Sequence, residues 1–566
     1  MAISPFRPPA SPYTRYQDPH HGPLMFALIL AAWLVAGVVG HDPWKPDETE
    51  HFGIVYSIIL TGDWVVPALA GIPELSRPPL YYAVAALFAR VFDGVLPLHD
   101  GARLATAFFM GLTFLFAGLA ARELYGKGYG RIGVLVLLGC LGLIIRGHQI
   151  LPETALLAGA AMVVHGLALG LRLPGTGGLV LGTGIGVAFM AEGLLAPAVG
   201  AVVVAILPFV SRQWRTRKMA ASVVIAVVVA APWLVVWPYL LNARSPELFR
   251  LWLETDLGRF PGVAGVSLDS ATFYLQALPW FAWPALPLAL WTLWHEGRAG
   301  LAHPGIHLPL IAFFVALAGA SLSPGARDVE GLPLLLPLAL LGAGGLYTLR
   351  RGAANSMYWF SIMGFSALAA AAWFYWAPLA LTVPDRLFQH LDRMRPGYNF
   401  GFRPLAFGFG LLLTIGWIVL IARLRRNAQR PIIAWAAGVT LVWGLLMSLL
   451  IGYIDHAKSY RTVVSSMRTA IPTKYDCMAS LRAGPDQRAM VHYYAGIMTK
   501  PVNGFDVAGC ELLLQVGHPD EWVDPEGGWE RVWEGRRPRD KTELWALYVK
   551  KPDSPPPGPK RPARRR

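Results

Sequence analysis

The chain has 566 residues, of which 55% are hydrophobic and only 15% are charged, with a mean hydropathy of +0.45. This composition excludes an ordinary soluble protein of such length and indicates a polytopic membrane protein. The net charge of +14 does not require nucleic acid as a partner, because much of the excess lies between apolar runs and in the tail Lys560–Arg566. Membrane orientation explains that distribution better.

Apolar runs dominate the chain after a polar lead. Residues 1–23 are rich in Pro, Ser and His, and we expect a disordered cytoplasmic segment. The run Leu24–Gly40 is expected to be an uncleaved first span, since no clear cleavage site follows it. Twelve further runs are long enough to be predicted spans. They lie at residues 102–120, 132–146, 153–171, 178–191, 194–210, 219–239, 278–294, 306–322, 332–348, 357–381, 405–422 and 431–453.

The sequence therefore predicts an all-α transmembrane domain over residues 24–453 with about thirteen helices. Inside one run, Gly178, Gly182 and Gly186 recur every four residues, which suits close helix packing and not a dinucleotide site.

Basic residues cluster in alternate connections between the runs, and the positive-inside rule places those connections in the cytoplasm. The clusters are Arg122/Lys127/Arg131, Arg172, Arg212/Arg215/Arg217/Lys218, Arg298, Arg350/Arg351 and Arg423/Arg425/Arg426/Arg430. The loops 41–101 and 240–277, and everything after Tyr453, then lie on the periplasmic side. All the polar segments of interest share that side.

Residues 454–552 have the composition of a small periplasmic α/β domain. We expect a helix near residues 459–471 and strands at Met490–Tyr494, Glu511–Val516 and Leu544–Val549. Residues 553–566 are expected to form a disordered basic tail.

The three cysteines fall in two kinds of environment. Cys477 and Cys510 both lie in the predicted outer domain, so we expect one disulfide in an oxidising compartment. Cys140, inside an apolar run, is expected to be a core residue.

The first outer loop carries the strongest site candidate. Asp47, Glu50 and His51 are spaced to share one helical face, where they can work together as acid, base or metal ligands. The structural alternative is that Asp47, after Pro46, caps a helix and that Glu50 completes a capping box.

Fixed positive charge is also present on this side. Arg77 precedes two prolines that stiffen the backbone, so it is a candidate phosphate clamp; the alternative is an arginine that reaches toward lipid headgroups. Arg259 and Arg327 can contribute to a phosphate site, or can pair with nearby Asp256 and Asp328.

Glu153 begins a predicted span at its outward end. An ionisable residue at such a place is a functional candidate. The alternative is an acidic residue that the helix dipole favours near a helix N-terminus.

These motifs together resemble the integral-membrane C-type glycosyltransferases, most closely the branch of the lipid A 4-amino-4-deoxy-L-arabinose transferases and the protein O-mannosyltransferases. The motifs are Asp47-Glu48 after the first span, Gly62-Asp63-Trp64 with Pro67, Arg77 before Pro-Pro, Ala102-Arg103-Leu104, Trp283-Pro284, and Ser321-Leu-Ser-Pro-Gly. The resemblance runs from about Trp33 to Tyr347, and the architecture of spans plus an outer C-terminal domain fits the aminoarabinose branch.

The resemblance implies roles for particular residues. Asp47 would be the main catalytic carboxylate, Glu153 a second catalytic acid in place of the usual Asp, and Arg77 would bind the donor phosphate in place of the usual Lys. Apart from these carried-over roles, we expect further polar side chains to contact substrate. These are Glu48, Glu50, His51, Tyr81, Tyr82, Arg103, Arg259 and Arg327.

The chain also departs from the family pattern. Glu50 stands where a basic residue is expected, and Glu192-Gly193 replaces the usual Lys-Gly, so the donor and acceptor stay open. Ser76 occupies the place of a metal-ligating Glu in some relatives, so a bound divalent metal stays open too.

A site outside the bacterial inner membrane has no nucleotide sugars, so a sugar donor must arrive activated on a lipid carrier such as a polyprenyl phosphate. Its leaving phosphate needs fixed positive charge, which Arg77 can supply. The sequence thus predicts an inner-membrane glycosyltransferase that modifies a lipid A-like acceptor. If the acceptor is a hydroxyl, Asp47 would act as general base; if it is a lipid phosphate, Asp47 would orient the acceptor or hold a cation.

Two alternatives remain. One is a protein O-mannosyltransferase-like enzyme with a protein acceptor. The other is a transporter or flippase of lipid-linked glycans, for which internal repeats and charges at the membrane midplane are typical. The sequence shows no repeat, and its charges cluster in outer loops, which favours the enzyme.

Overall fold

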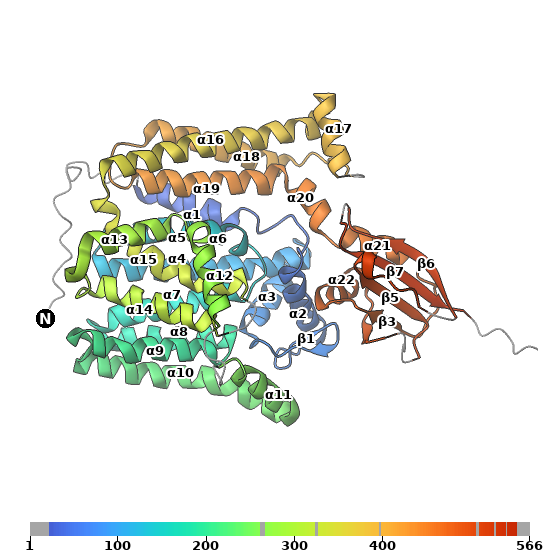
Figure 1. Ribbon diagram of the computed structural model, residues 1–566, viewed down its shortest axis with the longest axis horizontal. Helices are drawn as coiled ribbons and strands as arrows, with labels where there is room; N and C mark the ends of the chain where they lie inside the picture. Colours follow the sequence, from blue (N-terminus) through green and yellow to red (C-terminus); the bar gives the residue numbers. More distant parts are fainter. Residues whose placement is uncertain are drawn as a thin grey trace, which may run out of the picture.

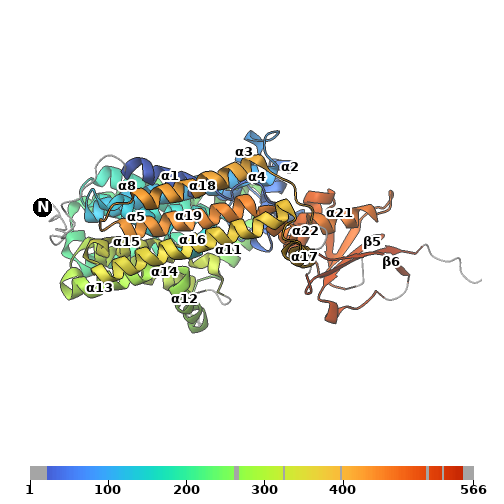
Figure 2. The ribbon, with the colours of Figure 1, turned by 90° about the horizontal axis from the view of Figure 1, so that it is seen from above.

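The computed structural model describes residues 22–260, 267–322, 326–395, 398–504, 509–525, 528–538 and 540–551. Long helices run side by side in one bundle, and a small α/β unit sits at one end of it, as Figures 1 and 2 show. We call the end of the bundle that meets this unit the site end. Residues 1–21 of the predicted lead and the predicted tail 553–566 lie outside the described residues.

Each predicted apolar run falls on a helix or on consecutive helices. These are α1 (Gly22–Val35), α4 (Leu98–Tyr125), α5 (Tyr129–Leu138), α6 (Leu141–Arg146), α7 (Glu153–Gly170), α8 (Pro174–Glu192), α9 (Leu195–Val210), α10 (Arg217–Arg244), α12 (Leu268–Phe281), α13 (Ala285–Gly300), α14 (Pro304–Ala320), α15 (Leu335–Gly345), α16 (Arg351–Leu381), α18 (Pro404–Arg423), α19 (Arg430–Leu449) and α20 (Ile451–Lys458). Short 3-10 turns η1 (Arg212–Trp214), η2 (Asp328–Leu334) and η3 (Leu346–Thr348) connect some of them.

Within the described residues, eight helices are long and apolar enough to cross a membrane, or nine if the bent pair α13–α14 is one span. Others, such as α1, α5 and α9, are apolar but shorter. The chain is therefore a multi-pass helical membrane protein, and the count of thirteen spans stays a prediction.

Glycines allow α8 and α10 to approach closely. A Cβ atom at Gly178, Gly182 or Gly186 would come within 2.6, 2.5 or 2.3 Å of atoms of α10. The spacing of four thus marks a helix-packing face, as predicted.

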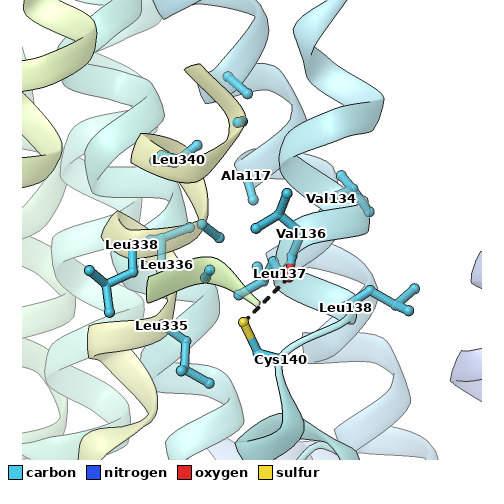
Figure 3. Packing of buried hydrophobic residues seen from close by; sticks show 14 of the residues in the cluster. Ala117, Val134, Val136, Leu137, Leu138, Cys140, Leu335, Leu336, Leu338 and Leu340 are labelled. Carbon is cyan, nitrogen blue, oxygen red and sulfur yellow. Dashed lines mark hydrogen bonds between the residues drawn. The ribbon is translucent and has the colours of Figure 1, made fainter. Parts of the chain in front are cut away.

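The apolar core is continuous through the middle of the bundle. Cys140 lies at the break between α5 and α6, fully buried beside Leu335 and Leu336 of α15 (Figure 3). Its Sγ donates to the carbonyl of Val136 at 3.3 Å. The prediction that Cys140 is a core residue is confirmed.

The segments expected as outer loops are largely helical. The first contains α2 (Asp47–Thr61), the two-stranded β1 (Ala68–Leu69) and β2 (Ile72–Pro73), and α3 (Leu80–Val91). Residues 240–277 hold the end of α10, α11 (Pro246–Leu257) and the start of α12. The short α17 (Asp385–Met394) follows α16 at the site end (Figure 1).

The C-terminal unit is a five-stranded sheet in the order β4-β3-β5-β7-β6. Its elements are α21 (Arg461–Thr469), β3 (Met478–Leu481), α22 (Pro485–Ala495), β4 (Thr499–Val502), β5 (Leu512–Gly517), η4 (Pro519–Glu521), β6 (Trp529–Gly535) and β7 (Leu544–Lys550). Strand β3 is parallel to β4 and β5, whereas β7 is antiparallel to β5 and β6. Cys477 and Cys510 form the expected disulfide, with Cα atoms 4.9 Å apart.

One predicted strand is wrong. Residues Met490–Tyr494 belong to helix α22, although their side chains favour strands. The helix begins with Pro485 and a capping interaction of Gln487 with Gly484, and it ends at Gly496 in the left-handed region. These flanking signals prevail over the propensity of five central residues.

Helix α22 packs on α2, so the C-terminal unit touches the first outer segment. A Cβ atom at Gly53 of α2 would lie 2.5 Å from the Cβ of Ala489 and 3.2 Å from Leu69. Real Cβ atoms do not approach so closely, and a larger residue must push the two helices apart.

We expect Gly53→Val to lower the free energy of unfolding by about 1–3 kcal/mol, the range for overpacked interfaces. Thermal unfolding of the purified protein in detergent measures it. Gly111→Ala in α4 is the control, because its added Cβ meets nothing within 4 Å. Equal unfolding temperatures for Gly53→Val and the parent protein would contradict this packing.

Candidate functional site

Asp47 is the first residue of α2 but does not cap it. The N-cap residue is Pro46, and no side-chain cap hydrogen bond is present. The Oδ1 atom of Asp47 pairs with Arg327 instead, and Oδ2 accepts from Arg146 Nη1 at 3.0 Å. The capping alternative is therefore wrong, and both carboxylate oxygens are engaged by arginines.

Arg146 extends this pairing into a chain of four charges. Its guanidinium also forms a bidentate pair with Asp328, with N–O distances of 2.9–3.0 Å. Arg327 thus pairs with Asp47 and not with the adjacent Asp328. The side chain of Arg327 is 49% exposed, whereas that of Asp47 is 6% exposed, so this chain opens to solvent at Arg327.

Arg77 belongs to a second chain of four charges. Its Nη2 donates to Glu153 Oε1 at 2.8 Å, and its Nη1 pairs with Glu192. Glu192 also pairs with Arg259, which donates to the Glu192 carbonyl at 2.9 Å. Arg77 is only 8% exposed, so the alternative of a headgroup-seeking arginine is wrong.

The electrostatics of this chain keep Arg77 charged. Burial alone would lower its pKa, but the carboxylates of Glu153 and Glu192 outweigh burial and raise it above the ordinary value. Two arginines face two glutamates, so the chain is neutral as a whole.

The turn after Glu192 positions Arg259. Gly193 has φ +89°, and a Cβ there would lie 2.6 Å from Asp256 Oδ2. Asp256 of α11 accepts from the Leu194 N–H at 2.7 Å and lies 3.5 Å from Arg259 Nη1. Asp256 therefore ties α11 to the end of α8, and Arg259 reaches Glu192 from there.

Segment η2 contributes residues near both chains of charges, the one that contains Asp47 and the one that contains Arg77. It carries Asp328 at one end, and its Glu330 lies near enough for its charge to act on Arg77. The hydroxyl of Tyr274 lies 3.2 Å from both Glu330 Oε2 and the Arg327 carbonyl. The predicted residues Asp47, Arg77, Glu153, Arg259 and Arg327 thus gather at the site end.

Three other predicted site residues are part of the protein interior. Arg103 Nε lies 2.5 Å from Glu48 Oε1, and both side chains are 0% exposed. Arg103 Nη1 also pairs with Asp100 Oδ1 at 2.5 Å. The Tyr81 hydroxyl lies 2.6 Å from Thr106 and accepts from the Leu151 N–H at 3.1 Å. These contacts hold the first outer segment to α4 and leave no surface for a substrate.

His51 and Tyr82 lie beside the second chain. Their side chains are joined by a 3.0 Å contact between His51 Nδ1 and the Tyr82 hydroxyl. Burial, with the charge of Arg77 second, lowers the pKa of His51 to about 3, so this imidazole is neutral.

Glu50 is half-buried in the first turn of α2. Burial, followed by the charges of Glu74 and Asp486, raises its pKa. Across the described part of the chain, no three His, Cys, Asp or Glu side chains come together as a metal site.

Arg146 was not among the residues predicted from the sequence for the site, Asp328 was considered only as a partner of Arg327, and Glu192 only as a departure from the family pattern. Arg146 and Glu192 each end an apolar run on the side where basic residues are scarce. A charged residue at that end of a run is the signal that would have found both.

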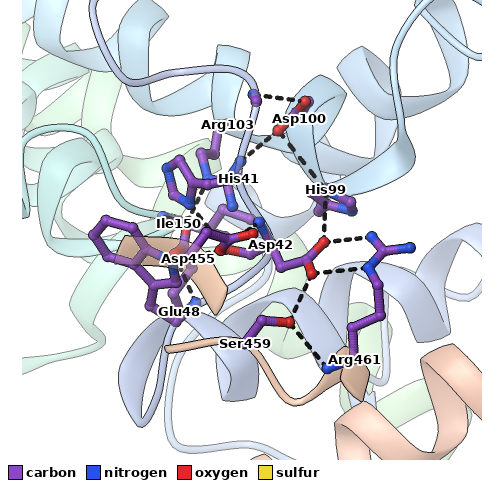
Figure 4. A network of polar contacts seen from close by, with 12 residues as sticks. His41, Asp42, Glu48, His99, Asp100, Arg103, Ile150, Asp455, Ser459 and Arg461 are labelled. Atoms are coloured by element: carbon purple, nitrogen blue, oxygen red, sulfur yellow. Dashed lines mark hydrogen bonds and ion pairs between the residues drawn. The ribbon is translucent and has the colours of Figure 1, made fainter. Parts of the chain in front are cut away.

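A third network joins the first outer segment to the start of the C-terminal unit (Figure 4). The Asp42 carboxylate accepts from Arg461 Nε at 2.8 Å and from the Ser459 hydroxyl at 2.6 Å. Asp455 Oδ1 accepts from the Asp42 N–H at 3.0 Å and from Trp44 Nε1 at 2.9 Å. The network thus fixes the backbone only a few residues before Asp47.

Comparison with known proteins agrees with the resemblance seen in the sequence. Residues 76–237 match the family model described as dolichyl-phosphate-mannose-protein mannosyltransferase. The chain is 29% identical over 439 residues to an undecaprenyl phosphate-alpha-4-amino-4-deoxy-L-arabinose arabinosyl transferase of Pseudomonas aeruginosa, across 75% of this chain and 74% of that protein. A transferase of the same description from Pseudomonas paraeruginosa is 31% identical over 319 residues, or 53% and 55% of the two chains.

The fold is shared with a solved structure. The crystal structure of ArnT from Cupriavidus metallidurans bound to undecaprenyl phosphate superposes with a TM-score of 0.67 at 18% identity, covering 93% of this chain and 97% of that one. The helical bundle with its C-terminal unit is therefore the ArnT architecture.

The third network makes stability depend on pH. Burial and the nearby Asp42 carboxylate raise the pKa of Asp455 to about 7, against about 3.9 in an unfolded chain. The folded protein then holds a proton that the unfolded chain has released, so this contribution is complete below about pH 4 and is lost as pH rises through 7. Asp42 does not titrate in this window, because hydrogen bonds from Arg461 and Ser459 outweigh burial and lower its pKa to about 2.

We expect Asp455→Asn to raise the unfolding temperature at pH 8 by about 2 °C or more and to leave it unchanged at pH 4. The amide oxygen can still accept from Trp44, so only the charge is removed. Thermal unfolding from pH 4 to pH 8 tests this, and parallel pH profiles for the parent and variant proteins would refute it.

Proposed function

We propose that this chain is a bacterial inner-membrane glycosyltransferase that moves a sugar from a polyprenyl-phosphate carrier to a lipid acceptor at the periplasmic face. The observation that carries the proposal is the gathering of four arginines at the site end, where Arg146 and Arg327 pair with Asp47 while Arg77 and Arg259 pair with Glu192. An anionic donor and an anionic acceptor both need such fixed positive charge. Similarity to the undecaprenyl-phosphate aminoarabinose transferases supports the same reaction.

In this reaction the bond between the sugar C1 atom and the carrier phosphate breaks, and a new bond forms between C1 and an acceptor oxygen. The phosphate leaves with the electron pair of the broken bond. Arg77 and Arg259 are placed to stabilise that charge. Both already pair with Glu192, so the donor phosphate must compete with a carboxylate for them.

Asp47 has a different role from a free general base. Both of its oxygens are occupied, so it can take a proton from a hydroxyl only if an ion pair opens. As it stands, the carboxylate positions Arg146 and Arg327, whose charges suit an acceptor that is itself a phosphate. A phosphate oxygen attacks without losing a proton, and we therefore favour a lipid phosphate over a hydroxyl acceptor.

The proposal includes the topology. The transmembrane domain spans residues 24–453, residues 454–552 form a periplasmic domain, and the site end faces the periplasm. The alternating basic connections support this arrangement.

The direct test supplies purified protein with undecaprenyl-phosphate 4-amino-4-deoxy-L-arabinose and lipid A, and follows the mass of the products. We expect sugar-modified lipid A from the parent protein. Asp47→Asn should fold normally and lose about 100-fold of the rate, because the two guanidinium groups lose the charge that orients them.

Asp93→Asn is the matched control, since Asp93 is an exposed carboxylate of the same outer segment. It should transfer at the parent rate. Near-parent transfer by folded Asp47→Asn protein would remove Asp47 from the mechanism, and a sugar found only on protein would replace the lipid acceptor by a protein.

Glu192 gives a test of donor binding alone. Glu192→Gln frees Arg77 and Arg259 from a competing charge, so we expect undecaprenyl phosphate to bind about 10-fold more tightly, a gain of about 1.4 kcal/mol. The control is Glu254→Gln, which changes an exposed carboxylate of α11. Titration with undecaprenyl phosphate measures both, and unchanged or weaker binding by Glu192→Gln would show that the two arginines do not hold the phosphate.

A further inference from the structure

Many arginines at the site end pair with carboxylates, but several cations there do not, and three of these lie close to one another. Arg77, Arg103, Arg146, Arg259, Arg327, Arg461 and Arg537 each lie within 4.0 Å of a carboxylate. Within the part of the chain that the structure describes, Arg395, Arg403 and Lys458 form no such pair. All three lie where α17, α18 and α20 meet at the site end.

Arg395 is the most constrained of the three. It follows the last turn of α17, its guanidinium lies 5.7 Å from the centre of the Tyr453 ring, and its Nη1 donates to the Met394 carbonyl at 3.2 Å. Its Nε is buried and has no hydrogen-bond partner. A buried donor without a partner is costly, so this N–H is available to donate to an oxygen of a bound group.

Lys458 lies between Arg395 and the candidate site. Its Nζ is 6.0 Å from the centre of the Trp44 ring. Burial lowers its pKa, and the charges of Arg537, Lys45, Arg146 and Arg395 lower it further. Asp455, one helical turn earlier, accepts hydrogen bonds from Asp42 and Trp44 and forms no ion pair with Lys458.

Arg403 stands beside a shallow aromatic pocket at the same corner. Trp376, Tyr398, Phe400, Arg403 and Phe407 are among the residues that line this pocket. The Arg403 guanidinium lies 3.4 Å from the Gly40 carbonyl, which ties this corner to the first outer segment. A Cβ at Gly452 would lie 2.8 Å from the Tyr398 hydroxyl, so the aromatic segment packs directly on α20.

We propose that Arg395, Arg403 and Lys458, together with this aromatic pocket, bind the phosphate-bearing headgroup of the acceptor lipid. The inference rests on the proposed function for the identity of the ligand as acceptor. An amphiphile with an anionic head fits this corner, because cations without a carboxylate partner lie beside apolar aromatic surface at the end of apolar helices.

The position also suits the reaction. Lys458 is close enough to Arg146 for the two charges to interact, and Arg146 pairs with Asp47 at 3.0 Å. A headgroup held by Arg395 and Lys458 would therefore enter next to Asp47, on the α20 side. Arg77 and Arg259, which we propose bind the donor phosphate, lie on the side of α8 and α11. The donor and the acceptor therefore need not enter the site by the same route.

The test uses the double variant Arg395→Gln/Lys458→Gln in nanodiscs of neutral lipid. Native mass spectrometry measures binding of lipid A, of lipid A stripped of its phosphates, and of phosphatidylglycerol. We expect the double variant to lose about 10-fold or more in affinity for lipid A, the scale of one charge-assisted contact. Dephosphorylated lipid A should bind the parent protein as weakly as lipid A binds the variant.

Arg386→Gln is the matched control. It removes one exposed cation from α17, roughly 13 Å along the chain from Arg395 by helical rise, and should not change lipid A binding. Equal losses for phosphatidylglycerol and lipid A would identify a general anionic-lipid surface and overturn the acceptor site, as would unchanged binding by the double variant.

Donor binding separates this inference from the proposed function. Undecaprenyl phosphate should bind the double variant as it binds the parent protein, while the KM for lipid A in the transfer assay rises about 10-fold. If the parent protein transfers no sugar at all, the proposed function fails, and the phosphate-specific loss of lipid A binding still decides whether this corner is a lipid-phosphate site.

Discussion

The site end depends on one constraint, which is that a buried charge needs an opposite charge beside it. Arg77 and Arg103 are almost or fully excluded from solvent, and each is held by two acidic side chains. Removing one member of such a group leaves an uncompensated charge, which costs about 3–5 kcal/mol. The first outer segment can therefore carry many charges near a membrane, because α4, α7 and α8 supply their counter-charges.

The same pairing limits how the proposed chemistry can begin. In the proposed reaction a donor phosphate meets Arg77 and Arg259, but Glu192 already pairs with both. The phosphate must displace a carboxylate of equal sign, so donor affinity is set by the difference between two ion pairs and not by the strength of one. In the proposed reaction, the departure from the family pattern at Glu192 thus affects the free energy of donor binding, while the fold stays that of the solved structure.

The helices could be predicted because apolar runs determine them locally, and every run from Leu24 to Tyr453 falls on helical structure. Asp47, Arg77 and Glu153 could be predicted as a group because a resemblance placed them together, and Arg259 because it is a cation in an outer segment. Their partners could not, since Arg327 pairs with Asp47 across 280 residues and Arg146 across 99. Sequence spacing contains no information on such contacts. The prediction of a strand at Met490–Tyr494 was wrong although the relevant signals were local. It relied on the strand propensity of these residues and not on the capping residues beside them.

The packing of helix α2 limits which segments can be exchanged between this protein and its relatives in a chimera. One end of α2 carries Asp47, and Gly53 on its next turns fits against Ala489 of the C-terminal unit with no room for a side chain. Phe52 packs in the same place, 4.7 Å from the Tyr493 ring. A chimera that exchanges the C-terminal unit alone would place a foreign surface on this helix. An exchange of domains therefore has to move α2 and the C-terminal unit together, although about 400 residues separate them in the chain.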